Sequence, residues 1–214
     1  VGMLIQNAFD NIVHEHLEYY SLLSLEYLLA KHDLEVFDVS QNDINGGSFR
    51  TYIRFKGAKI CAKCGMKRVM AMLEREKWLK LDKKANYLIF ASKVKAIVDK
   101  LSKFINKEVK KGKKVYVYGA STRGNTLLQA AKLDSTQITA AAERNSFKWG
   151  RKCVGTNIPI VSEEEARKAN PDYFLVLPWF FRHEFMGREI EYLNQGGKLI
   201  FPLPEFGILQ KGGK

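Results

Sequence analysis

The sequence contains little cysteine and no long apolar stretch, and each absence narrows the class of protein. Its 214 residues include three cysteines, an odd number that is too small for a disulfide scaffold and fits a reducing compartment. No run of about 18 apolar residues is present, which excludes a membrane-spanning helix. No charged stretch followed by an apolar one opens the chain, as it would in a secretion signal. We therefore expect a cytoplasmic protein that does not bind a membrane.

The chain also offers few ligands for a metal ion. Cys61 and Cys64 are spaced like one half of a zinc knuckle, but the second half is missing, because Cys153 is alone and far along the chain. Residues 14–16, His-Glu-His, could turn both imidazoles to one side of an extended segment, which supplies only two ligands. We therefore predict no metal site, and the role of the two neighbouring thiols is left open.

Basic residues are concentrated in one part of the chain. Residues 56–114 contain 19 Lys and Arg against 5 Asp and Glu, whereas the rest contains 16 against 18. A basic segment can bind nucleic acid. Here, however, the lysines alternate at helical spacing with an apolar stripe over 94–105, which is typical of a solvated helix face. No aromatic residues interleave with the lysines as in a base-stacking platform, so we predict no nucleic-acid partner.

The beginning of the chain resembles a small unit that adds an antiparallel edge to a sheet. Residues 4–20 start with a short strand-like stretch and continue as a polar loop. Ser21 is suited to cap a helix that ends near residues 31–32. The segments 34–39 and 48–55 then have the pattern of two strands joined by a turn.

A helical stretch over 66–110 is followed by alternating strands and helices. The expected strands are 114–118, 136–142, 158–161, 173–178 and 198–201, and the expected helices are 125–133, 163–169 and 181–193. Ser162 and Glu165 have the spacing of a capping box. Because the connections are short, this alternation predicts an α/β fold with a Rossmann-like, mostly parallel sheet flanked by helices.

A glycine-rich turn, GASTRGN, lies between the first of these strands and its helix. Its spacing nearly matches a P-loop, but Asn125 stands in place of the lysine that would reach the phosphates. It also lacks the G-x-G-x-x-G pattern of a standard NAD site. Two interpretations remain: a tight turn without a ligand, or a cradle for a diphosphate or for hydroxyl groups at a helix N-terminus. The cradle would use Gly119, Ser121, Arg123, Gly124 and Asn125.

Seven stretches together resemble one known family. They are 9–16 (FDNIVHEH), 20–26 (YSLLSLE), 46–50 (GGSFR), 118–126 (YGASTRGNT), 143–150 (ERNSFKWG), 155–160 (GTNIPI) and 175–179 (LVLPW). In this order and spacing they are similar to the sugar C-methyltransferases that act on nucleotide-linked keto-deoxysugars. The resemblance covers most of the chain, and it is least evident over 60–80.

The resemblance implies a division of the chain and a cofactor. Members of the family have a zinc-binding domain, a class I methyltransferase domain and a C-terminal Rossmann-like domain. Residues 1–58 would be the end of the methyltransferase domain with its catalytic loop, 59–112 a basic helical connector, and 113–214 the Rossmann-like domain. The S-adenosylmethionine site would lie mainly upstream, so this fragment alone would be inactive, and Cys61 and Cys64 would not belong to the zinc domain.

The resemblance also assigns roles to site residues. Glu15 and His16 map onto the family's base motif. Methylating a carbon requires an enolate, and a histidine that titrates near neutral pH can remove the proton next to a ketone. His14, Ser48, Arg50 and the glycine-rich turn would bind the substrate. The chain departs from the family at Val13, where relatives usually carry a tyrosine, so no phenol is available there.

We therefore predict the C-terminal portion of an S-adenosylmethionine-dependent enzyme that deprotonates a nucleotide-linked keto sugar and methylates that carbon. The alternative is a non-catalytic Rossmann-like module that binds a nucleotide or a protein partner, and nucleic-acid binding ranks third. The sugar, the ring carbon, the nucleotide and the oligomeric state are left open.

Overall fold

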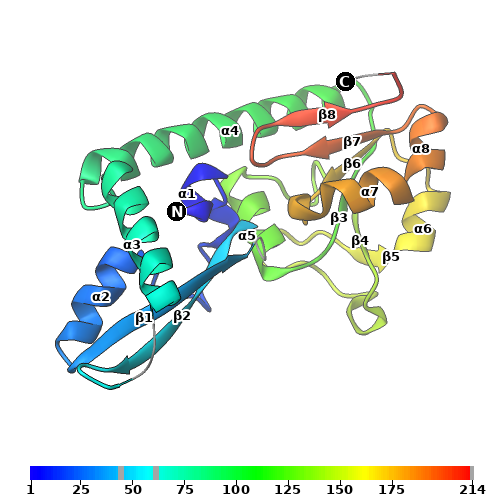
Figure 1. Cartoon of the computed structure of the whole chain (residues 1–214). Helices are drawn as coiled ribbons and strands as arrows, with labels where there is room; N and C mark the ends of the chain where they lie inside the picture. Colours follow the sequence, from blue (N-terminus) through cyan, green and yellow to red (C-terminus); the bar gives the residue numbers. More distant parts are fainter. Residues whose placement is uncertain (43–45, 60–62, 213–214) are drawn as a thin grey trace. The chain divides into compact units, whose positions relative to one another are not determined.

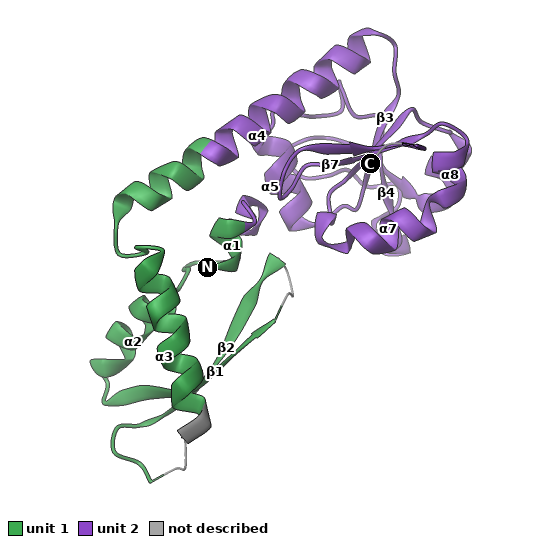
Figure 2. Cartoon of the chain, turned by 45° about the horizontal axis from the view of Figure 1, so that its top comes forward, with its two compact units in different colours: residues 1–5, 14–92 green, residues 6–13, 93–214 purple. Residues whose placement is uncertain are grey.

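The computed structural model describes residues 1–42, 46–59 and 63–212, and the chain divides into two compact units (Figure 2). Unit 1 comprises residues 1–5 and 14–92, and unit 2 comprises residues 6–13 and 93–214. These limits differ from the expected ones at 58 and 112. The reasons are that one long helix continues through residue 92 and that residues 6–13 pack with unit 2.

Unit 1 is a helical layer on a two-stranded antiparallel sheet (Figure 1). Its elements are α1 (Gly2–Ile5), α2 (Leu22–Ala30), β1 (Leu34–Asn42), β2 (Ser48–Phe55), α3 (Lys63–Trp78) and the first part of α4 (Lys84–Lys110). Its core is formed by Leu22, Leu29, Val36, Val39, Val69 and Met72, which come from α2, β1 and α3. One face of the sheet is therefore covered by α2 and α3.

Local chemistry explains where the helices of unit 1 lie. Ser21 caps α2 by accepting a hydrogen bond from the Ser24 N–H at 3.1 Å, as expected. The buried Glu76 of α3 accepts the next free N–H groups, those of Leu22 and Leu23, each at 2.9 Å. A carboxylate at a helix N-terminus also complements the helix dipole. Helix α3 is thereby joined to the start of α2.

Unit 2 has a six-stranded sheet with the order β5-β4-β3-β6-β7-β8, in which only β8 is antiparallel to its neighbour. Its strands are β3 (Val115–Tyr118), β4 (Ala140–Glu143), β5 (Ile160–Ser162), β6 (Tyr173–Val176), β7 (Lys198–Phe201) and β8 (Gly207–Leu209). Its helices are η1 (Phe9–Asn11), the second part of α4, α5 (Thr122–Ala130), η3 (Ser146–Lys148), α6 (Glu163–Lys168), η4 (Trp179–Phe181), α7 (Arg182–Arg188) and α8 (Ile190–Asn194). The predicted α/β class with a mostly parallel sheet is confirmed.

Helices cover both faces of this sheet. Tyr173 and Phe174 are neighbours in β6, so their side chains point to opposite faces. Tyr173 packs edge-on against Phe104 of α4, with ring centroids 5.4 Å apart. Phe174 packs against Tyr192 of α8 at 5.1 Å and stacks on Tyr118 of β3 at 4.2 Å. All four residues of β3 and of β6 are buried, which fits central strands of a parallel sheet.

Several expected bounds were wrong. The strand-like start of 4–20 is instead the helical turns α1 and η1. The expected strand 136–142 begins only at residue 140, because residues 135–137 form a turn in which Asp134 accepts the Thr136 N–H at 2.7 Å. Helix α5 begins three residues earlier than expected. The expected helix 181–193 is divided into α7 and α8 at Glu189.

Two further findings complete the fold. Strand β8 was not predicted, since its assignment depends on antiparallel pairing with β7. No helix within 1–42, 46–59 and 63–212 is long and apolar enough to cross a membrane. Cys61 lies outside the described residues, and the side chain of Cys64 is likewise not described, so the question of these thiols is untouched.

Candidate functional site

The residues of the predicted base motif lie in unit 1, in the segment that precedes α2. His14, Glu15 and His16 are all exposed. Glu15 Oε1 lies 3.9 Å from His14 Nε2, and the His16 ring meets Tyr19 edge-on with centroids 6.2 Å apart. An exposed imidazole can exchange a proton with a bound molecule.

Ser48 and Arg50 also lie in unit 1, on β2. They are two residues apart, so their side chains share one face of the strand. Both are exposed, and β1 places Asn42 and Ser40 opposite them in the antiparallel register. Their side chains are therefore accessible to solvent on that face, and their predicted role in substrate binding stays a prediction.

The glycine-rich turn lies in unit 2, between β3 and α5. Gly119 has φ of +86°, a left-handed conformation that favours glycine. The Ser121 Oγ accepts the Gly124 N–H at 3.1 Å and so caps α5. The Ala120 N–H donates to Glu143 Oε2 at 2.9 Å. Two of the amides that a phosphate cradle would offer are therefore bound within the protein.

Gly124 has a packing role. It is buried in the first turn of α5, and a Cβ at this position would lie 2.8 Å from Leu177 Cδ1 and 3.4 Å from Ser121 Oγ. The absence of a side chain thus permits close contact between α5 and the end of β6, a known role of glycine in helix–strand turns. Asn125 follows with a buried Oδ1 that has no hydrogen-bond partner among the described residues.

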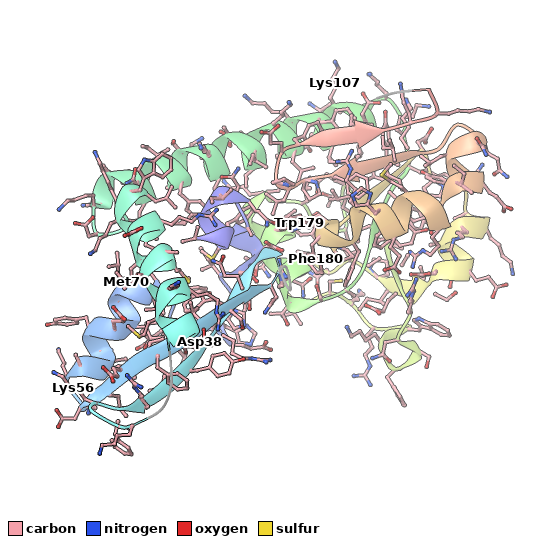
Figure 3. All side chains as sticks on the ribbon, in the orientation of Figure 1. Asp38, Lys56, Met70, Lys107, Trp179 and Phe180 are labelled. Carbon is pink, nitrogen blue, oxygen red and sulfur yellow. The ribbon has the colours of Figure 1, made fainter. Side chains whose placement is uncertain are left out.

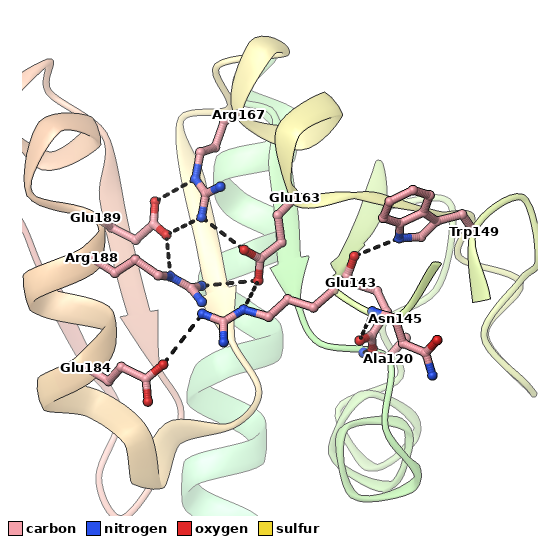
Figure 4. A network of polar contacts seen from close by, with 10 residues as sticks. Ala120, Glu143, Asn145, Trp149, Glu163, Arg167, Glu184, Arg188 and Glu189 are labelled. Carbon is pink, nitrogen blue, oxygen red and sulfur yellow. Dashed lines mark hydrogen bonds and ion pairs between the residues drawn. The ribbon is translucent and has the colours of Figure 1, made fainter. Parts of the chain in front are cut away.

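Glu143 ends β4 and holds the turn in place (Figure 4). Burial raises the pKa of its carboxyl, but the hydrogen bonds from the Asn145 and Ala120 N–H groups, together with the Lys148 charge, outweigh burial and hold this pKa below its usual value. The Trp149 indole donates to the Glu143 carbonyl at 2.7 Å. Dinucleotide-binding folds place a ribose-binding acid at a comparable position. In this chain the acid is ionised and bonded to its own turn.

A second polar network in unit 2 is balanced in charge (Figure 4). It consists of Arg144, Arg167, Arg188, Glu163, Glu184 and Glu189. The buried Glu189 carboxylate accepts hydrogen bonds from Arg167 at 2.8 and 3.2 Å and from Arg188 at 2.9 Å. Because three cations neutralise three anions, this network joins α6 to α7 and α8 without leaving a net charge for a ligand.

The buried carboxylate of Asp10, which lies near the turn, was not predicted from the sequence. Its side chain is 1% exposed, and its Oδ2 accepts hydrogen bonds from Arg123 Nε at 3.0 Å, Arg123 Nη2 at 2.6 Å and Trp179 Nε1 at 3.1 Å. The Arg123 guanidinium also lies 4.6 Å from the centroid of the Phe180 ring. Trp179 and Phe180 are labelled in Figure 3. Burial raises the pKa of Asp10 although Arg123 and Trp179 oppose that change.

These contacts bring together residues from three of the stretches noted in the sequence, 9–16, 118–126 and 175–179. Asp10 lies in the first of these stretches, but no nearby residue in the sequence indicated that Arg123 and Trp179 would be its partners. Val13, which ends the part of this stretch that belongs to unit 2, is buried and apolar. The position at which the resemblance led us to expect a tyrosine therefore contributes to the core.

Comparison with known proteins gives two matches. The family model described as the C-methyltransferase C-terminal domain matches residues 43–204. The chain is also 35% identical over 206 residues to the C-methyltransferase NovU of Streptomyces niveus, an alignment that covers 96% of this chain and 48% of that protein. The chain thus spans about half the length of this curated relative.

Proposed function

The chain belongs to the C-methyltransferase family, of which it carries the C-terminal domain, and on this premise we propose that it forms the C-terminal part of an S-adenosylmethionine-dependent enzyme that methylates a nucleotide-linked keto sugar at the carbon next to its ketone. The similarity to a C-methyltransferase along almost the whole chain carries this proposal. The exposed imidazoles and carboxylate of residues 14–16 add the groups that the first chemical step needs.

In this proposal His16 is the base. Its imidazole takes the proton from the carbon next to the ketone, and the electron pair left behind forms an enolate. Glu15 supports the imidazolium by its negative charge, and the exposed His14 and the exposed face of β2 with Ser48 and Arg50 bind the sugar. S-adenosylmethionine supplies the methyl group when it is bound.

We propose that the described residues do not form the site for S-adenosylmethionine themselves. In the strand-to-helix turn after β3, Gly124 packs closely on Leu177. Glu143 accepts a hydrogen bond from the Ala120 N–H of the same turn. The methyl donor would therefore bind in the half of the protein that corresponds to the rest of the relative.

Unit 1 fits the end of a larger methyltransferase domain. A two-stranded sheet has little stability by itself, and large apolar side chains of unit 1 are exposed. They include Leu17, Tyr27, Phe55 and Trp78. Strands of a class I methyltransferase domain would pair with the β1–β2 sheet and bury part of this apolar surface. The non-catalytic alternative gives no reason for a motif with two exposed histidines in this unit.

The proposal is tested with the full-length protein, a nucleoside-diphosphate-linked keto-deoxysugar and S-adenosylhomocysteine in deuterated water. Wild type should exchange the proton next to the ketone without methyl transfer, and His16→Asn should lower this exchange about a hundredfold to ten-thousandfold, the usual contribution of a general base. His32→Asn is the matched control, because His32 is also exposed but lies at the end of α2, outside the motif.

Three outcomes are informative. Exchange at the wild-type rate in His16→Asn, with loss in His14→Asn, would move the base to His14, whose Nε2 lies 3.9 Å from Glu15 Oε1. Exchange at the wild-type rate in all variants would exclude His14 and His16 as the base. Binding of the sugar nucleotide without exchange or methylation by the wild type would favour the non-catalytic module.

A further inference from the structure

The segment that leads into the base motif is bound at the carboxyl ends of the strands of unit 2, which is where Rossmann-like folds bind their ligands. We infer that Asp10, Arg123 and Trp179 form a positioning cluster. The cluster holds this segment in place and so restricts the positions that residues 14–16, which follow it in the chain, can take. The inference rests on the proposed function, because the motif it positions is the proposed base.

The place of the cluster follows from sheet topology. Strand β3 lies between β4 and β6, so the strand order reverses there, and open α/β sheets bind ligands outside the carboxyl ends of the strands at this point. Arg123 is the second residue of α5, which follows β3, and Trp179 lies three positions after the end of β6. Their common partner at this edge is the protein's own Asp10 carboxylate.

A second contact anchors the same segment. The Asn7 side chain, which is buried, donates from Nδ2 to the Pro204 carbonyl at 3.1 Å, and Pro204 lies three positions after the end of β7. The segment from Asn7 to Asp10 is therefore bound to residues that follow three neighbouring strands, β3, β6 and β7. Since His14 follows Asp10 by four positions, fixing Asp10 restricts the positions that the motif can take.

The chemistry of the cluster suits the selection of one backbone arrangement more than a gain in stability. Arg123 Nε, Arg123 Nη2 and Trp179 Nε1 all donate to one oxygen, Oδ2 of Asp10, whereas Oδ1 is buried and has no hydrogen-bond partner among the described residues. Burying an ion pair costs hydration, and apolar replacements of such pairs are often as stable or more stable. The best attested use of buried ionic groups is to select one register or arrangement. An aspartate held by a forked guanidinium and an indole N–H selects one position for its backbone.

The cluster also gives Arg123 a role different from the predicted cradle. Its Nε and Nη2 are both directed at Asp10, and its guanidinium packs over Phe180. Arg123 therefore acts on the reaction through Asp10 and the chain that follows, and it is a positioning residue.

The test uses the full-length enzyme and the variant Asp10→Asn, which keeps the size of the side chain and removes its charge. We expect kcat and the rate of solvent deuterium exchange to fall at least about tenfold, which is the effect of losing alignment of the base, while KM for the nucleotide sugar changes by less than about twofold. The matched control is Asp172→Asn, which removes the ion pair with Lys113 elsewhere in unit 2 and should change neither quantity.

Trp179→Phe provides a milder second variant, because it removes the indole N–H and keeps an aromatic ring. It should lower kcat in the wild-type background and have no further effect in Asp10→Asn, since Trp179 acts through the same carboxylate. Additive losses in the double variant, or a wild-type kcat in both folded single variants, would overturn the inference.

Backbone deuterium uptake separates this inference from the proposed function. Asp10→Asn should exchange the amides of residues 11–16 faster than wild type, whereas Asp172→Asn should not. If the wild type is inactive, the proposed function fails, but faster uptake in Asp10→Asn still supports the anchoring. Unchanged uptake together with unchanged kcat refutes it.

Discussion

Replacing Tyr173 by phenylalanine removes one hydrogen bond from the interior of unit 2. The Tyr173 hydroxyl donates to Glu108 Oε2 at 2.8 Å, and both residues are buried. Lys111 Nζ lies 2.7 Å from the other oxygen, so the carboxylate keeps one partner in the variant and loses one. A hydrogen bond to a charged group contributes about 1.5–3 kcal/mol. We expect Tyr173→Phe to lower the free energy of unfolding by this amount near neutral pH.

The same contact predicts how the difference changes with pH. Burial and, second, the hydrogen bond to Glu108 raise the pKa of Tyr173 to about 12, from an ordinary value of 10.0. The folded protein therefore holds this proton to higher pH than the unfolded chain. The stabilisation is complete below pH 10 and is lost as the pH rises through 12, by up to about 2.7 kcal/mol over two pH units. Phenylalanine has no proton to lose, so the two stability curves should converge.

The assay is urea unfolding of both proteins at several values between pH 7 and pH 11, with phenolate absorbance followed in parallel. Tyr27→Phe is the control, because Tyr27 is exposed on α2 and its removal should leave stability unchanged within about 0.5 kcal/mol. A stability difference between wild type and Tyr173→Phe that stays constant from pH 8 to pH 11 would refute the argument. So would a variant that is as stable as the wild type at neutral pH.

Two further predictions concern packing and acid stability. A Cβ at Gly65 would clash with the Phe37 carbonyl oxygen, so Gly65→Ala should destabilise unit 1 by about 1–3 kcal/mol in chemical unfolding. Gly187→Ala, with nothing within 4 Å, should not. The hydrogen bond from Lys111 and, second, the one from Tyr173 lower the pKa of Glu108. The ionised Glu108 carboxylate therefore stabilises the fold above the ordinary pKa of a glutamate, and this stabilisation is lost as the pH falls through the lowered pKa. Glu108→Gln should therefore make unfolding less dependent on pH in acid, and an unchanged acid slope would contradict this assignment.

Local patterns in the sequence determined much of the fold. The strands 48–55 and 198–201 have the predicted bounds, and Ser21 and Ser162 cap the helices that were expected after them. These features depend on residues close together in the chain: a cap needs one oxygen and an N–H three positions later. The alternation of strands and helices was enough to predict a mostly parallel sheet, because short connections leave few other arrangements.

Tertiary structure decided the features whose cause lies in a distant segment. Strand β8 exists because β7 pairs with it. Residues 6–13, expected within the end of the methyltransferase domain, pack with unit 2. Neither periodicity nor propensity specifies such partners, because both describe one segment at a time.

The site divides in the same way. The motif at residues 14–16 was predicted from the family resemblance and from its residue types, since the chemistry expected of a base belongs to single side chains. The cluster around Asp10 was not evident, because Arg123 and Trp179 lie 113 and 169 positions away in the sequence. A buried charge is tolerated only where partners surround it. Folding alone determines which distant residues become those partners, and so the structure of unit 2 identified the cluster.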